Sequence, residues 1–129
     1  MNNGNLEEAK QCMKSLISNV PYSNKKLVSM DMEERYRLII STILNAIGCQ
    51  VEVEHMLSTG RIDIVASTSR FIYVMELKLA NNGGINAAEK QMIDNGYLKP
   101  FLADDRKVIG VAVELDDMGK GLIDWKEVK

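Results

Sequence analysis

The residues best suited to chemistry are two acids and a lysine on neighbouring predicted strands. Asp63 interrupts one apolar strand, and Glu76 and Lys78 interrupt the next, which begins at Phe71. Charges on a buried strand are costly unless they are paired, hydrogen-bonded or bound to a metal. Two converging carboxylates offer the oxygen ligands that Mg²⁺ prefers, and a lysine beside them can orient a water. The triplet indicates a hard-cation site, and the alternative is a structural salt bridge between Glu76 and Lys78.

A β-hairpin can bring the two acids together. The two strands are separated by a short polar turn centred on Ser69, which is typical of antiparallel pairing. Pairing that is symmetric about Ser69 sets residue 63 opposite residue 75. One residue of bulge or twist then moves Asp63 beside Glu76. We therefore expect the two carboxylates to lie on adjacent strands at one end of the sheet.

The Glu-x-Lys spacing has little specificity by itself, because it occurs three times. The triplets begin at Glu8, Glu76 and Glu127. The first lies in a predicted helix, where residues two apart do not face each other, and the last stands at the chain end. Only the triplet at Glu76 follows an acid-bearing strand within a predicted hairpin.

Hydrophobic periodicity predicts the elements that must position these side chains. Two helices come first, then three strands, a helix and two strands. The crossover helix between the third and fourth strands predicts that those two strands are parallel. The fold class is therefore α/β with a mixed sheet. The expected helices cover about 6–18, 32–47 and 86–98, and the expected strands about 51–56, 61–67, 71–79, 107–115 and 122–128.

Capping patterns support the first two helices. Asn5 with Glu8, and Asp31 with Glu34, have the spacing of capping boxes, in which a side chain accepts a hydrogen bond from a free N–H of the first turn. Gly48 stands where a helix C-terminal glycine is expected. The first helix and its connector are assigned to residues 1–28.

Composition limits the classes of protein. The chain has 129 residues, of which 46% are hydrophobic and 26% charged, so it is long enough for one domain with a real core. The net charge of -2 and the 5% of aromatic residues exclude a strongly basic nucleic-acid coat and a large base-stacking platform. Cys12 and Cys49 are interpreted as reduced residues in or near the core.

The N-terminus is polar and acidic, which is unlike a secretory signal. The most apolar stretch, 38–47, is shorter than the roughly 20 residues that a membrane span needs. We expect a soluble, cytoplasmic protein without a membrane partner.

Several motifs together resemble a known family, the PD-(D/E)xK nuclease superfamily. More narrowly, they are similar to the nuclease-like module at the C-terminal end of predicted bacterial AAA-type ATPases. The resemblance extends from about Leu16 to Trp125. It rests on the segments 60–65 (GRIDIV) and 73–78 (YVMELK), on Gln91 in a helix that ends at Tyr97, and on 108–111 and 123–125.

The resemblance implies a restriction-endonuclease-like core. That core has a mixed central β-sheet of four to five strands flanked by helices, in the order α-α-β-β-β-α-β-β. It implies that residues 1–129 form a single PD-(D/E)xK nuclease-like domain. The chain lacks the phosphate-binding loop of an ATPase, so an AAA-type ATPase is expected only as a partner module in related proteins.

The resemblance also assigns roles to individual residues. Asp63, Glu76 and the backbone carbonyl of Leu77 would bind Mg²⁺ or Mn²⁺. Lys78 would position the attacking water, and Gln91 would hydrogen-bond near the lysine or the phosphate.

One further acid comes from the long helix. Glu33 would point into the site as an auxiliary acid, with Glu34 as the alternative. Two positions depart from the family pattern: Ile62 stands where proline is common, and Arg37 where the narrower family often has histidine. The role of Arg37 is left open.

The implied function is metal-dependent hydrolysis of phosphodiester bonds in nucleic acid, with DNA favoured over RNA. The alternative is a catalytically inactive nuclease-fold module that mediates protein or nucleic-acid interaction, and the net charge and the few aromatics favour it. A homodimer is an open possibility for the assembly. A third interpretation is a structural domain whose carboxylates only form salt bridges.

Overall fold

The computed structural model describes residues 6–18 and 31–128. Its elements follow the predicted order, with two short 3₁₀ segments added. They are α1 (Leu6–Ser18), α3 (Met32–Ala46), β1 (Gln50–Leu57), β2 (Gly60–Ser67), β3 (Phe71–Leu79), η1 (Ala80–Asn82), α4 (Gly84–Asp94), η2 (Lys99–Phe101), β4 (Lys107–Leu115) and β5 (Leu122–Val128).

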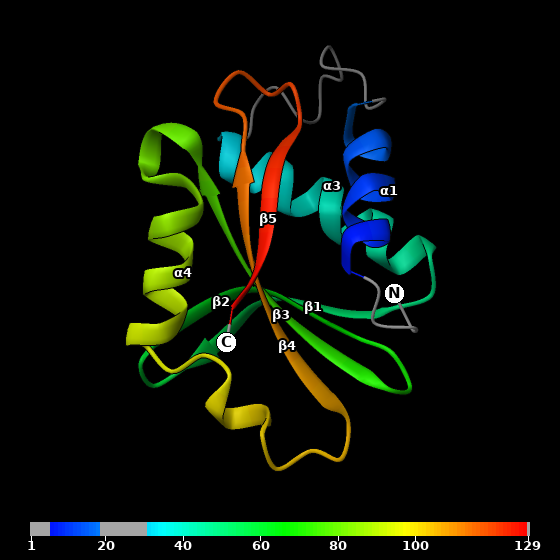
Figure 1. The fold of residues 1–129 in the computed structure, drawn as a ribbon, viewed down its shortest axis with the longest axis vertical. Coiled ribbons are helices and arrows are strands. Elements are labelled where there is room, and N and C mark those ends of the chain that lie inside the picture. Colours follow the sequence, from blue (N-terminus) through cyan, green and yellow to red (C-terminus); the bar gives the residue numbers. More distant parts are fainter. Residues whose placement is uncertain (1–5, 19–30, 129) are drawn as a thin grey trace.

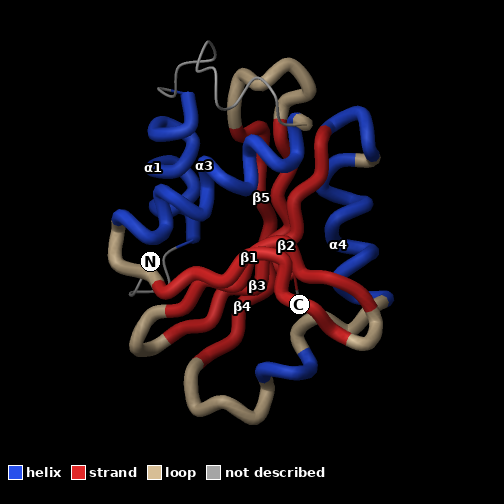
Figure 2. Tube along the Cα trace, turned by 180° about the vertical axis from the view of Figure 1, so that it is seen from behind, coloured by secondary structure: helices blue, strands red, loops and turns tan. Residues whose placement is uncertain are grey.

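The strands form one sheet in the order β1-β2-β3-β4-β5. The β3–β4 pair is parallel and the other neighbouring pairs are antiparallel, as the crossover helix predicted. The helix α4 lies on one face of this sheet, and α1 and α3 lie on the other (Figures 1 and 2). The predicted α/β fold with a mixed central sheet is confirmed, and it fits a restriction-endonuclease-like core.

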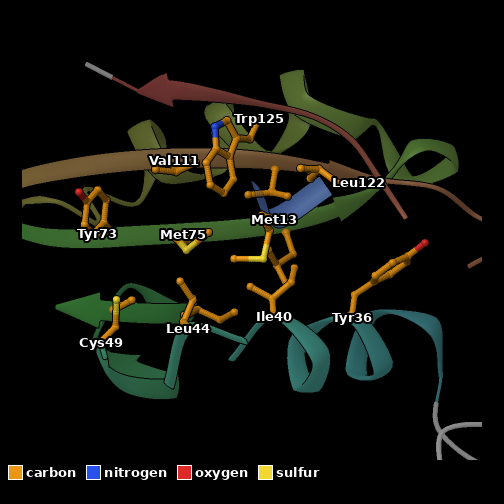
Figure 3. Close-up of a cluster of buried hydrophobic side chains, with 14 of the residues drawn as sticks. Met13, Tyr36, Ile40, Leu44, Cys49, Tyr73, Met75, Val111, Leu122 and Trp125 are labelled. Carbon is orange, nitrogen blue, oxygen red and sulfur yellow. The ribbon is translucent and has the colours of Figure 1, made fainter. Parts of the chain in front are cut away.

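Two apolar clusters fill the two faces of the sheet. Figure 3 shows part of the larger one, in which Ile40 and Leu44 of α3 point toward β3, where Met75 faces them. The smaller cluster lies under α4 and includes Ala88 and Met92. The strand β3 supplies side chains to both clusters and is buried from residue 71 to residue 77. A strand covered on both faces is rigid, which suits it to hold a site at its end.

The helix α3 begins and ends as the sequence predicts. The side chain of Asp31 accepts a hydrogen bond from the backbone N–H of Glu34 at 2.8 Å. At the other end Gly48 has a φ of +100°, and the N–H of Cys49 bonds to the carbonyl of Leu44. This is the Schellman arrangement, in which glycine adopts the left-handed conformation at no steric cost. The capping box at Asn5 lies outside the described residues.

The helix α4 is offset from its predicted range of 86–98. It starts two residues earlier because Glu114 of β4 accepts a hydrogen bond from the N–H of Ile85 at 2.9 Å and so caps the helix from another strand. It ends four residues earlier in a second Schellman arrangement, with Gly96 at a φ of +61° and the N–H of Tyr97 bonded to the carbonyl of Met92.

The two cysteines differ in their surroundings. Cys49 is buried at the edge of the larger cluster, as predicted, whereas Cys12 is exposed on α1. The placement of Cys12 near the core was therefore wrong, because its position on the helix faces away from the sheet. Among the described residues no helix is long and apolar enough to cross a membrane.

Candidate active site

The register of β2 and β3 sets the two acids opposite each other. The paired residues include Ile64 with Met75 and Val65 with Val74, so the next positions along the strands are Asp63 and Glu76. The predicted register, symmetric about Ser69, was wrong by one residue. The reason lies in the turn, where the N–H of residue 68 bonds to the carbonyl of residue 71 and leaves a two-residue connection. No bulge is needed to bring the acids together.

The side chain of Asp63 continues the contact between the strands where backbone pairing stops. Its Oδ2 accepts a hydrogen bond from the backbone N–H of Leu77 at 2.8 Å. In an antiparallel ladder one residue's N–H and C=O point to the same edge of the strand. Asp63 is therefore fixed against the edge of β3 that also carries the carbonyl of Leu77.

The carboxyl group of Glu76 is buried, and one of its oxygens has no partner. The residue is 2% exposed, and its Oε2 has no hydrogen bond. Burial is the largest cause that raises the pKa of Glu76 well above its usual range, and the hydrogen bond and charge of Asp63 raise it further. The charge of Glu33 acts in the same direction, and that of Lys78 opposes it. Asp63, Glu33 and Lys78 therefore all influence the charge of this buried carboxyl group.

The sequence-predicted residues line one open cleft of about 710 Å³. Glu33 comes from the first turn of α3, Asp63 from β2, Glu76 and Lys78 from β3, and Gln91 from α4. Leu77 lines the cleft as well. The structure brings these residues together, and their roles stay predictions. Glu34, the alternative to Glu33, lines a different surface depression.

The rest of the cleft lining carried no predicted site role. It consists of the β1–β2 hairpin tip, residues 56–61, together with Asn95 and Tyr97 after α4. The hydroxyl of Thr59 donates to the carbonyl of Asn95 at 2.8 Å and joins the hairpin to the helix end. The family resemblance included Gly60, Arg61 and Tyr97 without giving them a role, and the Asn95–Gly96 dipeptide is a common turn signal.

Gln91 is held by a buried tyrosine. Its Nε2 donates to the hydroxyl of Tyr97 at 3.2 Å, and Nδ2 of Asn95 donates to the same hydroxyl at 3.2 Å. The backbone of Gly60 packs so closely that an added Cβ would lie 2.6 Å from that hydroxyl. The orientation of Gln91 therefore depends on the absence of a side chain at Gly60.

Arg37, whose role the sequence left open, lies against Asp63. Its Nη2 is 2.7 Å from Oε1 of Glu54, and its Nη1 is 3.6 Å from Oδ1 of Asp63. Arg61 approaches the other oxygen of Glu54 at 3.7 Å. A chain of alternating charges thus runs from the rim of the cleft to the acid pair.

The donor set fits a hard divalent cation. The described residues contain no group of three or more His, Cys, Asp or Glu side chains arranged to hold a metal by themselves. Mg²⁺ does not require one, because it keeps several waters and is usually held by one or two carboxylates. The unpartnered oxygen of Glu76 beside Asp63 is the observation that supports the fit, since a cation would bind that oxygen and offset the negative charges of both acids once they are ionised.

Comparison with known families agrees with this geometry. The sequence model of a family described as the PD-(D/E)XK nuclease superfamily matches residues 31–125. The chain therefore belongs to the PD-(D/E)XK nuclease superfamily, whose nucleases typically use divalent metal ions. Comparison with curated proteins gives no match. Membership indicates a nuclease-type hydrolase with a nucleic-acid substrate.

Proposed function

We propose that the protein hydrolyses phosphodiester bonds of nucleic acid in a reaction that depends on Mg²⁺ or Mn²⁺, with DNA favoured over RNA. One observation carries the proposal: the buried, unpartnered carboxylate oxygen of Glu76 lies beside Asp63 in a cleft that also contains Lys78. A buried acid with a raised pKa, beside a second acid in a cleft, is typical of a functional site rather than of a structural ion pair.

In this proposal Asp63, Glu76 and the carbonyl of Leu77 hold the ion. When bound, the ion makes a coordinated water more acidic and offsets charge on the phosphoryl oxygens. The hydrogen bond from the N–H of Leu77 keeps Asp63 in place for this task. Lys78 faces the same cleft and stabilises developing negative charge, and its positive charge favours the ionised form of Glu76.

Glu33 and Gln91 act on the substrate side of the cleft. Glu33 lies near enough to influence the charge of Glu76 and supplies an auxiliary acid from the start of α3. Gln91, oriented by Tyr97, offers its amide group to the phosphate or to Lys78. Neither residue ligates the ion directly in this scheme.

The test is a Mn²⁺ titration by calorimetry, because it needs no knowledge of the substrate. Wild type is expected to show saturable binding that is lost in Asp63→Ala and in Glu76→Ala. Glu127→Ala serves as the matched control, since Glu127 is exposed on β5 and begins another Glu-x-Lys triplet. Cleavage of single- and double-stranded DNA and RNA is then compared with and without Mn²⁺. Unchanged cleavage by Glu76→Ala would contradict the assignment.

The competing function is a nuclease-fold module without catalysis that binds protein or nucleic acid. The observation that favours it is the guanidinium of Arg37, which already lies 3.6 Å from Asp63 and offsets part of its charge. This function predicts nucleic-acid binding that needs no metal and is unchanged in Glu76→Ala. Binding measured at several salt concentrations with and without Mn²⁺ separates the two functions.

The proposed partners follow from the same assignment. Nucleic acid is the substrate, an AAA-type ATPase module accompanies this domain in related proteins, and a homodimer is an alternative assembly. Light scattering of the protein alone and with a short DNA measures the assembly directly.

A further inference from the structure

One residue with a strained backbone lies on β1, the strand next to Asp63 of the candidate active site. Glu54 has a φ of +54°, and it is the only non-glycine residue with a positive φ in the described ranges 6–18 and 31–128. This conformation is unfavourable for a residue with a Cβ. The pairs Val53–Ile64 and His55–Ile62 flank it, so Glu54 stands across the β1–β2 ladder from Asp63.

The strain coincides with a change in the sheet. Ile62 and Ile64 stand two residues apart on β2 and would normally face the same side. They instead pack into different apolar clusters, Ile62 under α4 and Ile64 under α3. The expected alternation along β2 is therefore interrupted at Asp63, and Glu54 is the strained residue on the partner strand.

The strained position presents the carboxylate of Glu54 to Arg37. Their 2.7 Å contact is short enough for a charge-assisted hydrogen bond, whereas the 3.6 Å separation between Arg37 and Asp63 is too long for one. The side chain of Arg37 is only 12% exposed, so water does little to screen it. Arg37 is thus hydrogen-bonded to Glu54, whereas its contact with Oδ1 of Asp63 is the longer and looser of its two ion pairs.

We propose that Glu54 is a positioning residue that restrains Arg37 and so keeps Asp63 available to the metal ion. Without Glu54, the acid nearest to Arg37 is Asp63, and a guanidinium closing on that carboxylate would occupy the oxygen that a cation needs. The pair of Glu54 and Arg37 thereby sets the metal affinity of the site. This inference rests on the proposed metal-dependent function.

The inference predicts opposite effects for the two partners. Glu54→Gln should weaken Mn²⁺ binding by about tenfold, within the range that contacting charges show in double-mutant cycles. Arg37→Gln should leave the affinity unchanged or raise it, because it removes a competing positive charge. The double variant should bind as Arg37→Gln does. A purely structural role for Glu54 would not be rescued by removing Arg37.

A glycine at position 54 distinguishes the effect of the Glu54 carboxylate from the effect of the backbone strain. Glu54→Gly removes the carboxylate and also relaxes the backbone, because glycine adopts a positive φ readily. It should lose Mn²⁺ affinity as Glu54→Gln does, yet unfold at a higher temperature than Glu54→Gln. This variant keeps the test usable if Glu54→Gln fails to fold. Glu52→Gln, two residues earlier on the same strand with its side chain 62% exposed, is the matched control.

Calorimetric Mn²⁺ titration and thermal unfolding of these variants form the experiment. If wild type binds Mn²⁺ and Asp63→Ala does not, the proposed metal site stands. On that basis, Glu54→Gln with wild-type affinity overturns the inference, and so does Arg37→Gln with reduced affinity. A double variant that stays as weak as Glu54→Gln overturns it as well. If wild type binds no Mn²⁺, the proposed function fails first and the inference fails with it.

Discussion

At the scale of the residue, Glu76 is the side chain whose pKa is set by burial and by the other charged residues of the site. Burial and the neighbouring Asp63 both disfavour its ionised form, and they act against the single lysine at the end of the same strand. The pKa of Glu76 is accordingly raised to about 10, which favours the protonated form of the group at neutral pH when no metal is bound. A metal ligand must give that proton up.

This exchange gives a prediction about pH. Mn²⁺ binding should release about one proton near pH 7 and should strengthen by up to about tenfold for each unit of rising pH. Binding strengthens as pH rises because, at any pH below the raised pKa of Glu76, a proton competes with the ion for the carboxylate. Calorimetry in buffers with different ionisation enthalpies measures the proton release. Binding that is independent of pH would show that Glu76 is not a ligand.

At the scale of the element, the cleft depends on how the β1–β2 hairpin meets the end of α4. Thr59 and Gly60 make this contact, the first by a hydrogen bond to the carbonyl of Asn95 and the second by close packing on Tyr97. The contact has no room for a side chain at Gly60. The hairpin therefore helps to fix the orientation of Gln91 through Tyr97.

A glycine comparison tests this contact. Gly60→Ala should lower stability by about 1–3 kcal/mol and also impair nucleic-acid cleavage, because its Cβ would lie 2.6 Å from the hydroxyl of Tyr97. Gly48→Ala is the matched control: its φ is also positive, at +100°, but an added Cβ meets nothing within 4 Å. The control should lose about 1 kcal/mol and keep full activity per folded molecule. Denaturant unfolding and cleavage rates distinguish the two variants.

The elements were predictable because they depend on local patterns. Side-chain alternation identified β3 and placed Glu76 and Lys78 on the same face of it, and the caps of α3 needed only residues at its ends and next to them. The start of α4 was not predictable, because its cap comes from Glu114, a residue 29 positions away from the N–H that it accepts. The contact of Arg37 with Glu54 and Asp63 likewise joins a helix to two strands, and no spacing in the sequence reveals it.

At the scale of the whole molecule, the candidate site has a cost in stability. A raised pKa in the folded state means that the folded protein binds more protons than the unfolded chain above the usual glutamate pKa. Glu76 therefore contributes stability at low pH that is lost as pH rises toward its folded pKa. The metal-free protein should become progressively less stable over that interval.

Replacing the acid by its amide tests this cost. Glu76→Gln should raise the free energy of unfolding of the metal-free protein by about 1–3 kcal/mol at mildly alkaline pH, and by less as pH falls. The amide can donate to Asp63 and carries no charge to desolvate. Urea unfolding of wild type and Glu76→Gln across a pH series measures the difference. A constant difference would indicate a packing effect instead of a titrating acid.

The positive φ of Glu54 has a consequence for how the gene responds to selection. A library screened only for heat resistance should enrich glycine at this codon, since glycine relaxes the backbone there by about 1 kcal/mol. A library screened for metal-dependent activity should retain glutamate. The two screens would select different residues at a position that lines neither the cleft nor the core. Selection for thermal stability alone would remove the carboxylate that restrains Arg37.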